Sequence, residues 1–343
     1  MAIFGIEILA ILGFMVAAYS VVANDALQTL GTFLSSNSKR PWWILWLFAA
    51  SILVVVMLYG YYTQSGDIAF GRLNRLPYPE GGVQWYHVLP PIVLLVLTRY
   101  GIPVSTTFLV LTVFALTGGA ETEGVLGKML VKSGMGYVVA MLTGFLIYAL
   151  ISRVWSRWIH KTKDDPLPFY WTVIQWSATA FLWWQWLAQD FANIFIFLPR
   201  TTTVIDGATQ VTFNSTALVI ATVTMTLLLG WVFRGRGGNI QKIIDAKTNT
   251  TDVRAATVID LLFALILFFF KEMNDVPMST TWVFLGLIAG RELAISYFAS
   301  LRPKREALRD VLLDMGRLFF GLIVSIALAV FVPWVATGNF AGF

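Results

Sequence analysis

The chain has 343 residues, of which 57% are hydrophobic and 13% are charged, with a formal net charge of +5. Soluble domains carry about 25% charged and about 45–50% apolar residues, so the composition excludes an ordinary soluble domain and indicates an integral membrane protein. The Lys and Arg residues lie in short stretches between apolar segments, as topology determinants do, so no nucleic-acid partner is expected. Cysteine is absent, which excludes disulfides, thiolate metal sites and thiol catalysis.

Apolar segments recur along the whole chain, and most are long enough to cross about 30 Å of hydrocarbon in a lipid bilayer. In chain order they cover 3–23, 43–62, 85–99, 103–117 and 135–152 in the first half, and 169–187, 216–233, 256–271, 279–298 and 316–336 in the second. The segments at 85–99 and 103–117 are short, and the first contains Pro90 and Pro91. We therefore expect half-helices or one re-entrant hairpin there, within an all-α integral membrane protein.

The basic residues orient the predicted segments. The dense basic groups are Lys39–Arg40, Arg153 to Lys163, Arg234 to Arg254, and Arg302 to Arg309. If the segments alternate across the bilayer, all four groups fall on one side, which the positive-inside rule makes cytoplasmic, and both termini fall outside. The residues that count against this topology, because they fall outside, are Arg72, Arg75, Lys128 and Lys132. The prediction is a multi-pass protein of the cell membrane, the inner membrane in a bacterium.

Two motifs occur once in each half of the chain. Ala23-Asn24-Asp25-Ala26-Leu27-Gln28 and Ala188-Gln189-Asp190-Phe191-Ala192-Asn193 both read Ala-amide-Asp-x-x-amide, at the end of the first segment of each half. Pro103-Val104-Ser105-Thr106-Thr107 and Pro277-Met278-Ser279-Thr280-Thr281 open the fourth segment of each half. With about five segments per half, the second half enters the membrane from the opposite side. The sequence therefore predicts two inverted repeats, 1–160 and 161–343, as in alternating-access transporters.

The Pro-x-Ser-Thr-Thr motif has the chemistry of an anion site. Proline suits the first turn of a helix, and the helix N-terminus presents unpaired N–H groups and about +0.5 of charge. The motifs add the hydroxyls of Ser105, Thr106, Thr107, Ser279, Thr280 and Thr281. If the two starts converge, they suit a tetrahedral oxyanion such as phosphate or sulfate. The competing interpretation is that these hydroxyls bond back to the preceding turn and only support the helix.

The Asp motif has the chemistry of a cation site. A carboxylate inside a membrane costs about 2.5–3.5 kcal/mol, and neither aspartate has a Lys or Arg three or four residues away. Na⁺ bound at Asp25 and Asp190 would neutralise them, with amide oxygens as further ligands. The predicted cation-binding residues are Asn24, Asp25, Gln28, Gln189, Asp190 and Asn193. The alternative is that either aspartate caps a helix end. A co-bound cation would also offset the charge of the anion and couple its uptake to an ion gradient.

Other polar residues remain open. Asn274 and Asp275 fit either the anion site or an N-cap. Glu7, Asp260 and Glu292 lie in or near apolar segments, where a structural role competes with a proton-coupled one. We find no nucleotide-binding loop, no nucleophile–base pair and no metal-ligand cluster, so we expect neither an enzyme nor a cofactor beyond a coupling ion.

Taken together, these motifs resemble those of the inorganic phosphate transporter (PiT) family, over both halves of the chain. The resemblance implies that the hydroxyl residues contact phosphate and that the Asp and amide residues bind Na⁺ or contact phosphate. Family members have His after Ser-Thr-Thr, where this chain has Phe108 and Trp282, and Asn where it has Gln28 and Gln189. The chain is thus expected to be a divergent relative. Still open are sulfate or another inorganic anion as substrate, H⁺ as coupling ion, a homodimer, and a non-transport protein that reuses the scaffold.

Overall fold

The fold is that of an all-α membrane protein, as predicted. In this computed structural model, residues 2–3, 6–100, 102, 104–117, 124–162, 165–205, 208–237, 241, 252–273, 277–299 and 303–337 are described. Within these ranges, seven helices are long and apolar enough to cross a membrane, and two shorter apolar helices accompany them. Pro103 of the first hydroxyl motif and the two open candidates Asn274 and Asp275 lie outside the described residues.

The helices follow the predicted segments in order. The first half contains α1 (Ile8–Ser36), α2 (Trp42–Thr63), α3 (Trp85–Arg99), the π-helix η1 (Thr107–Leu111) that continues as α4 (Thr112–Thr117), and α5 (Val125–Lys161). The second half contains α6 (Phe169–Asp190), α7 (Ala192–Phe195), α8 (Ser215–Arg234), α10 (Val253–Met273), α11 (Thr280–Ala294) with the π-helix η3 (Ile295–Ala299), and α12 (Lys304–Thr337). Two short antiparallel pairs were not predicted: β1 (Ala2–Ile3) with β2 (Ile6–Glu7), and β3 (Thr201–Ile205) with β4 (Ala208–Thr212).

Several predicted boundaries are wrong, because α1, α5 and α12 extend well beyond the segments predicted at 3–23, 135–152 and 316–336. The first segment does not end at residue 23, because α1 continues without interruption to Ser36. Asp25 therefore lies inside a helix, and neither an unwound backbone nor a cap is found at this position. Apolar periodicity fades after residue 23 because the following turns carry polar side chains that face other helices and not lipid. In the second half, α6 does end at Asp190, and Phe191 separates it from α7.

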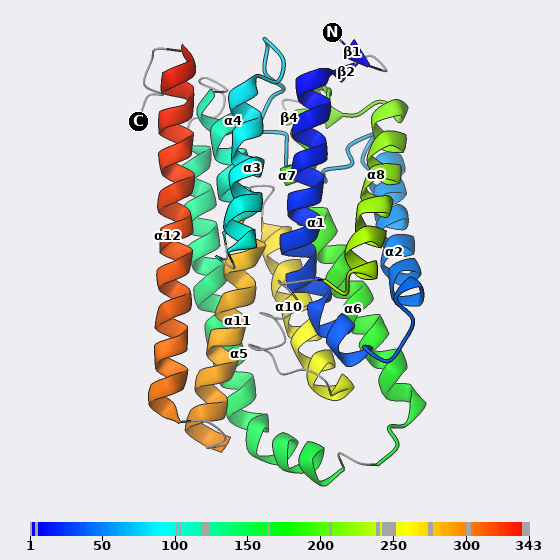
Figure 1. The fold of residues 1–343 in the computed structure, drawn as a ribbon, viewed down its shortest axis with the longest axis vertical. Coiled ribbons are helices and arrows are strands. Elements are labelled where there is room, and N and C mark those ends of the chain that lie inside the picture. The colour runs from blue at the N-terminus through cyan, green and yellow to red at the C-terminus, as the bar shows by residue number, and fades with distance from the viewer. Residues whose placement is uncertain are drawn as a thin grey trace.

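Two hairpins reach the middle of the molecule from opposite ends. In Figure 1, α3 descends from the end that carries both termini to about mid-height, and the chain then turns back through η1 and α4. From the other end, α10 rises to mid-height and α11 turns back. The tips touch, because Thr107 Oγ1 donates a hydrogen bond of 3.2 Å to the carbonyl oxygen of Met278. The short helices of the first hairpin confirm the expected half-helices.

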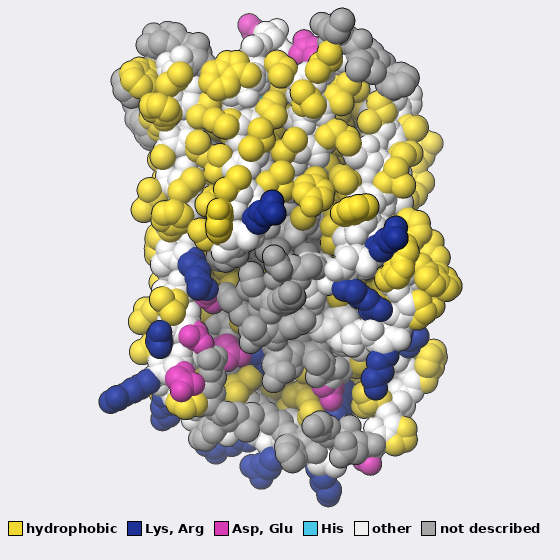
Figure 2. Space-filling view, viewed as in Figure 1, with side chains coloured by type: hydrophobic (Ala, Val, Ile, Leu, Met, Phe, Trp, Pro, Cys, Tyr) yellow, Lys and Arg dark blue, Asp and Glu magenta, His cyan; other side chains and the backbone are white. Residues whose placement is uncertain are grey.

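The charged side chains gather at one end. Figure 2 shows Lys, Arg, Asp and Glu mainly over the half away from the termini, while hydrophobic side chains cover the other half. The ends of α1, α5, α8 and α11 that lead into the four basic groups all point toward that end in Figure 1. We refer to it as the basic end. The grouping agrees with the predicted topology, in which this end is cytoplasmic.

Glycine allows α5 and α11 to pack in close contact. A Cβ atom added at Gly290 would lie 2.0 Å from the carbonyl oxygen of Met141, and one at Gly286 would lie 2.4 Å from that of Tyr137. On α5, a Cβ atom at Gly144 would lie 2.6 Å from the carbonyl oxygen of Leu287. Small residues spaced four apart are a frequent means of bringing membrane helices together, since nothing larger fits between the backbones.

We therefore predict that Gly290→Ala destabilises the protein by about 1–3 kcal/mol, because the added methyl collides with backbone and not with a movable side chain. The measurement is the thermal unfolding midpoint of the purified protein in detergent. Gly134→Ala is the matched control, since a Cβ atom there meets nothing within 4 Å and alanine favours the helix. Equal midpoints for the two variants would contradict the close packing of α5 against α11.

Candidate functional site

The predicted site residues are all buried, and most of them meet in one place. Gln28, with 9% of its surface exposed, is the most accessible of the twelve residues. The polar side chains lie where the tips of the two hairpins meet α1 and the end of α6. Polar and ionisable side chains inside a membrane protein are energetically costly. An enclosed group of hydroxyl, amide and carboxylate side chains of this kind therefore indicates a functional site.

The serines of the two hydroxyl motifs have the same local role. Ser105 Oγ accepts a hydrogen bond of 3.2 Å from the N–H of Phe108, and Ser279 Oγ accepts one of 3.3 Å from the N–H of Trp282. Each serine oxygen thus caps the N-terminus of its own helix. Because the oxygen acts as the acceptor, the hydroxyl hydrogen of each serine is left to donate to an anion. The rings of Phe108 and Trp282, which follow the two motifs, contact each other at a centroid distance of 5.6 Å.

Asp25 is surrounded by donors from its own helix and from the first hairpin. Asn24 Nδ2 donates to Asp25 Oδ1 over 2.8 Å, and Gln28 Nε2 donates to the same oxygen over 3.4 Å. Thr106 donates its hydroxyl to Asp25 Oδ2. The hydroxyl of Thr281, from the second hairpin, also lies beside this carboxylate. Asp25 therefore joins α1 to hydroxyl motifs from both halves of the chain.

Asp190 has fewer partners than Asp25. Asn193 Nδ2 donates to Asp190 Oδ1 over 2.6 Å and is 3.3 Å from Thr107 Oγ1. The Thr280 hydroxyl lies beside the Asp190 carboxylate. Even so, Asp190 Oδ2 and Asn193 Oδ1 have no hydrogen-bond partner of good geometry among the described residues. Two buried oxygens of this type, one of them anionic, are the ligands that a hard cation prefers.

The two carboxylates lie close enough to repel each other electrostatically. Removal from water and mutual repulsion both disfavour two anions at such a site, so the pair favours the binding of positive charge.

One predicted residue, Gln189, contributes less directly than expected. Gln189 Nε2 donates to the backbone carbonyl of Leu267 on α10 over 2.8 Å, so it ties α6 to the second hairpin.

Arg72 is a site residue that sequence reasoning missed. It lies in the connection between α2 and α3, its surface is 2% exposed, and its charge acts favourably on Asp190. Its Nη2 also donates to the carbonyl of Lys271 at the end of α10, over 3.3 Å. The signal that could have revealed it is its conflict with the positive-inside rule. A basic residue on the wrong side of the predicted topology calls for another explanation, here a buried one.

The Asp67 carboxylate stabilises the turn that carries Arg72. Asp67 accepts hydrogen bonds from the N–H groups of Ala69, over 2.7 Å, and Gly71, over 2.5 Å. Phe70 adopts a left-handed conformation with a φ of 54°, and Gly71 follows with a φ of 76°. This tight turn fixes the backbone immediately before Arg72, so that the guanidinium is directed inward.

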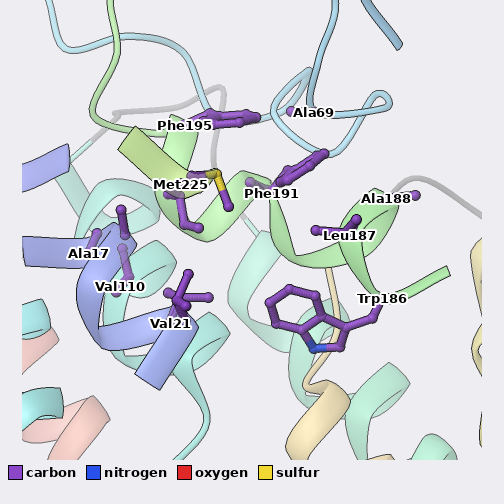
Figure 3. Close-up of a cluster of buried hydrophobic side chains, with 14 of the residues drawn as sticks. Ala17, Val21, Ala69, Val110, Trp186, Leu187, Ala188, Phe191, Phe195 and Met225 are labelled. Carbon is purple, nitrogen blue, oxygen red and sulfur yellow. The ribbon is translucent and has the colours of Figure 1, made fainter. Parts of the chain in front are cut away.

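An apolar cluster encloses the Asp190 side of the site. Figure 3 shows side chains from α1, η1, α6, α7 and α8 packed around the turn between α6 and α7. Those labelled include Ala17, Val21, Val110, Trp186, Leu187, Phe191, Phe195 and Met225. All are almost completely buried. Because this packing keeps water away, electrostatic interactions in the site are stronger than they would be at a surface.

The three other acidic residues of interest have different surroundings. Glu7 Oε2 accepts a hydrogen bond of 3.2 Å from the N–H of Val83, and Glu292 forms an ion pair of 2.7 Å with Arg291. Both contacts fit a structural role. Asp260 is fully buried on α10 and accepts hydrogen bonds from two threonines of other helices.

Comparison with known proteins identifies the fold. No family model matches the sequence, and no curated protein matches it. A solved structure, described as the sodium-dependent phosphate transporter, superposes with a TM-score of 0.61 at 15% sequence identity. The match covers 96% of this chain and 98% of that one. The chain has the fold of that transporter. At this identity the likeness concerns the architecture, and it extends over the whole membrane domain.

The repulsion between the two carboxylates predicts an unusual mutant. Asp190→Asn should raise the thermal unfolding midpoint of the ligand-free protein at neutral pH, because it removes a buried, incompletely satisfied charge whose burial costs about 2.5–3.5 kcal/mol. The control is Asp67→Asn, which should lower the midpoint, since the Asp67 carboxylate accepts two short backbone hydrogen bonds. A lower midpoint for Asp190→Asn, measured without Na⁺ or phosphate, would contradict this reading of the site.

Proposed function

We propose that the protein is a Na⁺-coupled transporter of inorganic phosphate that works by alternating access. The observation that carries this proposal is the meeting of two carboxylates and two hydroxyl motifs in one buried site between the halves of the chain. The fold shared with a sodium-dependent phosphate transporter supports it. Membership of the PiT family, as a divergent relative, is part of the same proposal.

Each set of residues has a role in this proposal. Na⁺ binds at the Asp25 and Asp190 carboxylates, and Asn193 Oδ1, which has no hydrogen-bond partner among the described residues, is a neutral ligand at the second position. Phosphate binds between the hairpin tips and receives hydrogen bonds from Ser105, Thr106, Thr107, Ser279, Thr280 and Thr281. Arg72 adds positive charge on the Asp190 side. Because the carboxylates repel an anion until they are neutralised, Na⁺ binding must accompany phosphate binding, which is the physical basis of coupling.

The carboxylates favour phosphate over sulfate. At neutral pH phosphate keeps at least one proton, so it can donate a hydrogen bond to a carboxylate oxygen, whereas sulfate has only acceptors. Asp190 Oδ2, which has no partner of good geometry among the described residues, is such an acceptor. Beside Na⁺, sulfate would face the same oxygen without a hydrogen atom between them, so it would lack the hydrogen bond that phosphate gains.

Alternating access follows from an inverted repeat, which we propose for residues 1–160 and 161–343. The packing partners correspond between the halves: α1 packs on α3 as α6 packs on α10, and α12 packs on α4 and η1 as α5 packs on α11. In addition, α1 contacts α8 as α6 contacts α2. The two repeats can then adopt two related conformations, one with the site open to one side of the membrane and one with it open to the other side. The basic end faces the cytoplasm of the cell in this proposal.

The direct test is uptake of labelled phosphate into proteoliposomes of the purified protein. An inward Na⁺ gradient should drive saturable accumulation, which a K⁺ gradient of equal size should not. Labelled sulfate should enter much more slowly under the same conditions. No accumulation of phosphate with any Na⁺ or H⁺ gradient would contradict transport, and accumulation of sulfate in preference to phosphate would contradict the proposed substrate.

Single substitutions should separate the two roles. Thr106→Ala and Thr280→Ala should raise the KM for phosphate by about tenfold, the effect of about 1.4 kcal/mol of lost hydrogen bonding. Asp25→Asn and Asp190→Asn should instead abolish the dependence of uptake on Na⁺. Thr112→Ala is the matched control, because Thr112 is buried in the same hairpin outside the motif. If all four variants transport like the parent, the site is assigned to the wrong residues.

A further inference from the structure

Asp260 is a buried carboxylate that the proposed phosphate site does not use. It lies in α10 with 0% of its surface exposed. Thr32 of α1 donates its hydroxyl to Asp260 Oδ1 over 2.5 Å, and Thr179 of α6 donates to Oδ2 over 2.6 Å. The carboxylate thus joins three helices, one from the first half and two from the second. Short O–H···O contacts of this length are typical of hydrogen bonds to an ionised group.

No cation within the described residues neutralises this group. Among the residues that the structure describes, neither Lys nor Arg forms an ion pair with Asp260, and its hydrogen-bond partners from α1 and α6 are the Thr32 and Thr179 hydroxyls. From α5, Tyr148 acts electrostatically on it. From α11, Arg291 lies 5.5 Å from the centre of the Tyr148 ring and pairs with Glu292 at 2.7 Å. On α10 itself, Arg254 lies nearly two turns away and pairs with Asp252. An isolated buried carboxylate is expected to exchange its charge for a proton when its surroundings change.

A seam of polar side chains links Asp260 to the basic end. Gln175 Nε2 lies 3.4 Å from Thr179 Oγ1 and 3.2 Å from Ser36 Oγ, and Gln175 Oε1 accepts from Asn37 Nδ2 over 3.0 Å. Asn37 Oδ1 in turn accepts from Arg40 Nε over 3.1 Å. Arg40 is partly exposed, near the end of the α1–α2 connection. These contacts form a continuous chain of hydrogen-bonding groups from Asp260 to Arg40, along which a proton can be passed between α1 and α6.

We propose that Asp260 is a proton-binding site, separate from the central Na⁺ and phosphate site and reached from the basic end. A proton from water at that end forms an O–H bond at the carboxylate and neutralises it, and the reverse step returns the proton to water. A proton fits better than Na⁺ because it needs only one oxygen. Thr179 Oγ1 and Gln175 Oε1 already accept hydrogen bonds, from Gln175 Nε2 and Asn37 Nδ2, whereas Na⁺ would require several free oxygen ligands.

The position of Asp260 couples this proton to the transport cycle. Thr32 lies two helical turns from Asp25 along α1, and α10 leads into the hairpin tip that carries Ser279 to Thr281. Protonation weakens the hydrogen bonds that Asp260 accepts, and so loosens the attachment of this hairpin to α1 and α6. A structural change with two hydrogen-bonding states is what links a binding event to a movement. This consequence rests on the proposed transport function, whereas proton binding itself does not.

Infrared difference spectroscopy of the purified protein tests proton binding without any substrate. Lowering the pH should produce the C=O stretching band of a protonated carboxylic acid that is present in the parent and lost in Asp260→Asn. Asp260→Glu should restore a titrating band. The control is Asp314→Asn, which removes a carboxylate paired with Arg317 and should leave the band unchanged. A band that does not titrate, or that survives in Asp260→Asn, overturns the proposal. A band that Na⁺ removes at constant pH overturns it as well, because Asp260 would then be a Na⁺ site.

Proteoliposomes test the coupling. Phosphate uptake by the parent should carry protons, measured with a pH-sensitive dye trapped inside the vesicles, and Asp260→Asn should lose this proton movement but keep Na⁺-driven phosphate exchange. Retained exchange shows that the variant is folded. If the parent carries phosphate without any proton linked to Asp260, the coupling is contradicted while phosphate transport stands. If the parent carries no phosphate, the proposed function fails, and the infrared titration still decides the proton site.

Discussion

The repulsion between two buried carboxylates governs the centre of this molecule. Asp25 and Asp190 come from different halves, lie within electrostatic reach of each other and are shielded from water. Such a pair is unfavourable by itself, so the site favours any arrangement that adds positive charge. Arg72 supplies part of it from a distant connection. In the proposed function a cation supplies the rest, and phosphate follows only when the carboxylates are neutralised.

The surrounding packing holds the carboxylates in this unfavourable position. The glycines of α5 and α11 lock the second hairpin against a long helix, and the apolar cluster around the turn between α6 and α7 fixes Asp190. Membrane helices gain little from burying apolar surface against each other, since lipid is equally apolar, so close backbone contact and interhelical hydrogen bonds must provide the stability. Tightly packed helix pairs beside an electrostatically unfavourable centre suit a protein that moves as a few rigid bodies.

The sequence predicted the elements whose signals are local. The apolar segment at 85–99 coincides with α3, and the segment at 43–62 differs from α2 by one residue at each end. The duplicated motifs indicated which hydroxyl and carboxylate residues lie together, because a motif repeated in corresponding segments of the two halves suggests corresponding positions in the fold. Contacts between distant parts could not be predicted. The inward turn of Arg72 depends on Asp67 and on α10, and the continuation of α1 past Asp25 depends on polar faces that only neighbouring helices reveal.

The two halves are similar but not equivalent, and the difference has a consequence for binding. Asp25 receives hydrogen bonds from Asn24, Gln28 and Thr106, whereas Asp190 keeps an oxygen without a partner of good geometry among the described residues. Donors that stabilise an anion reduce what it gains from a cation. The less satisfied carboxylate therefore gains more, which favours Asp190 as the first to bind Na⁺ in the proposed cycle. Once Na⁺ neutralises Asp190 in this cycle, the repulsion on Asp25 falls. The hydroxyls between the two hairpins then become free to hold the anion.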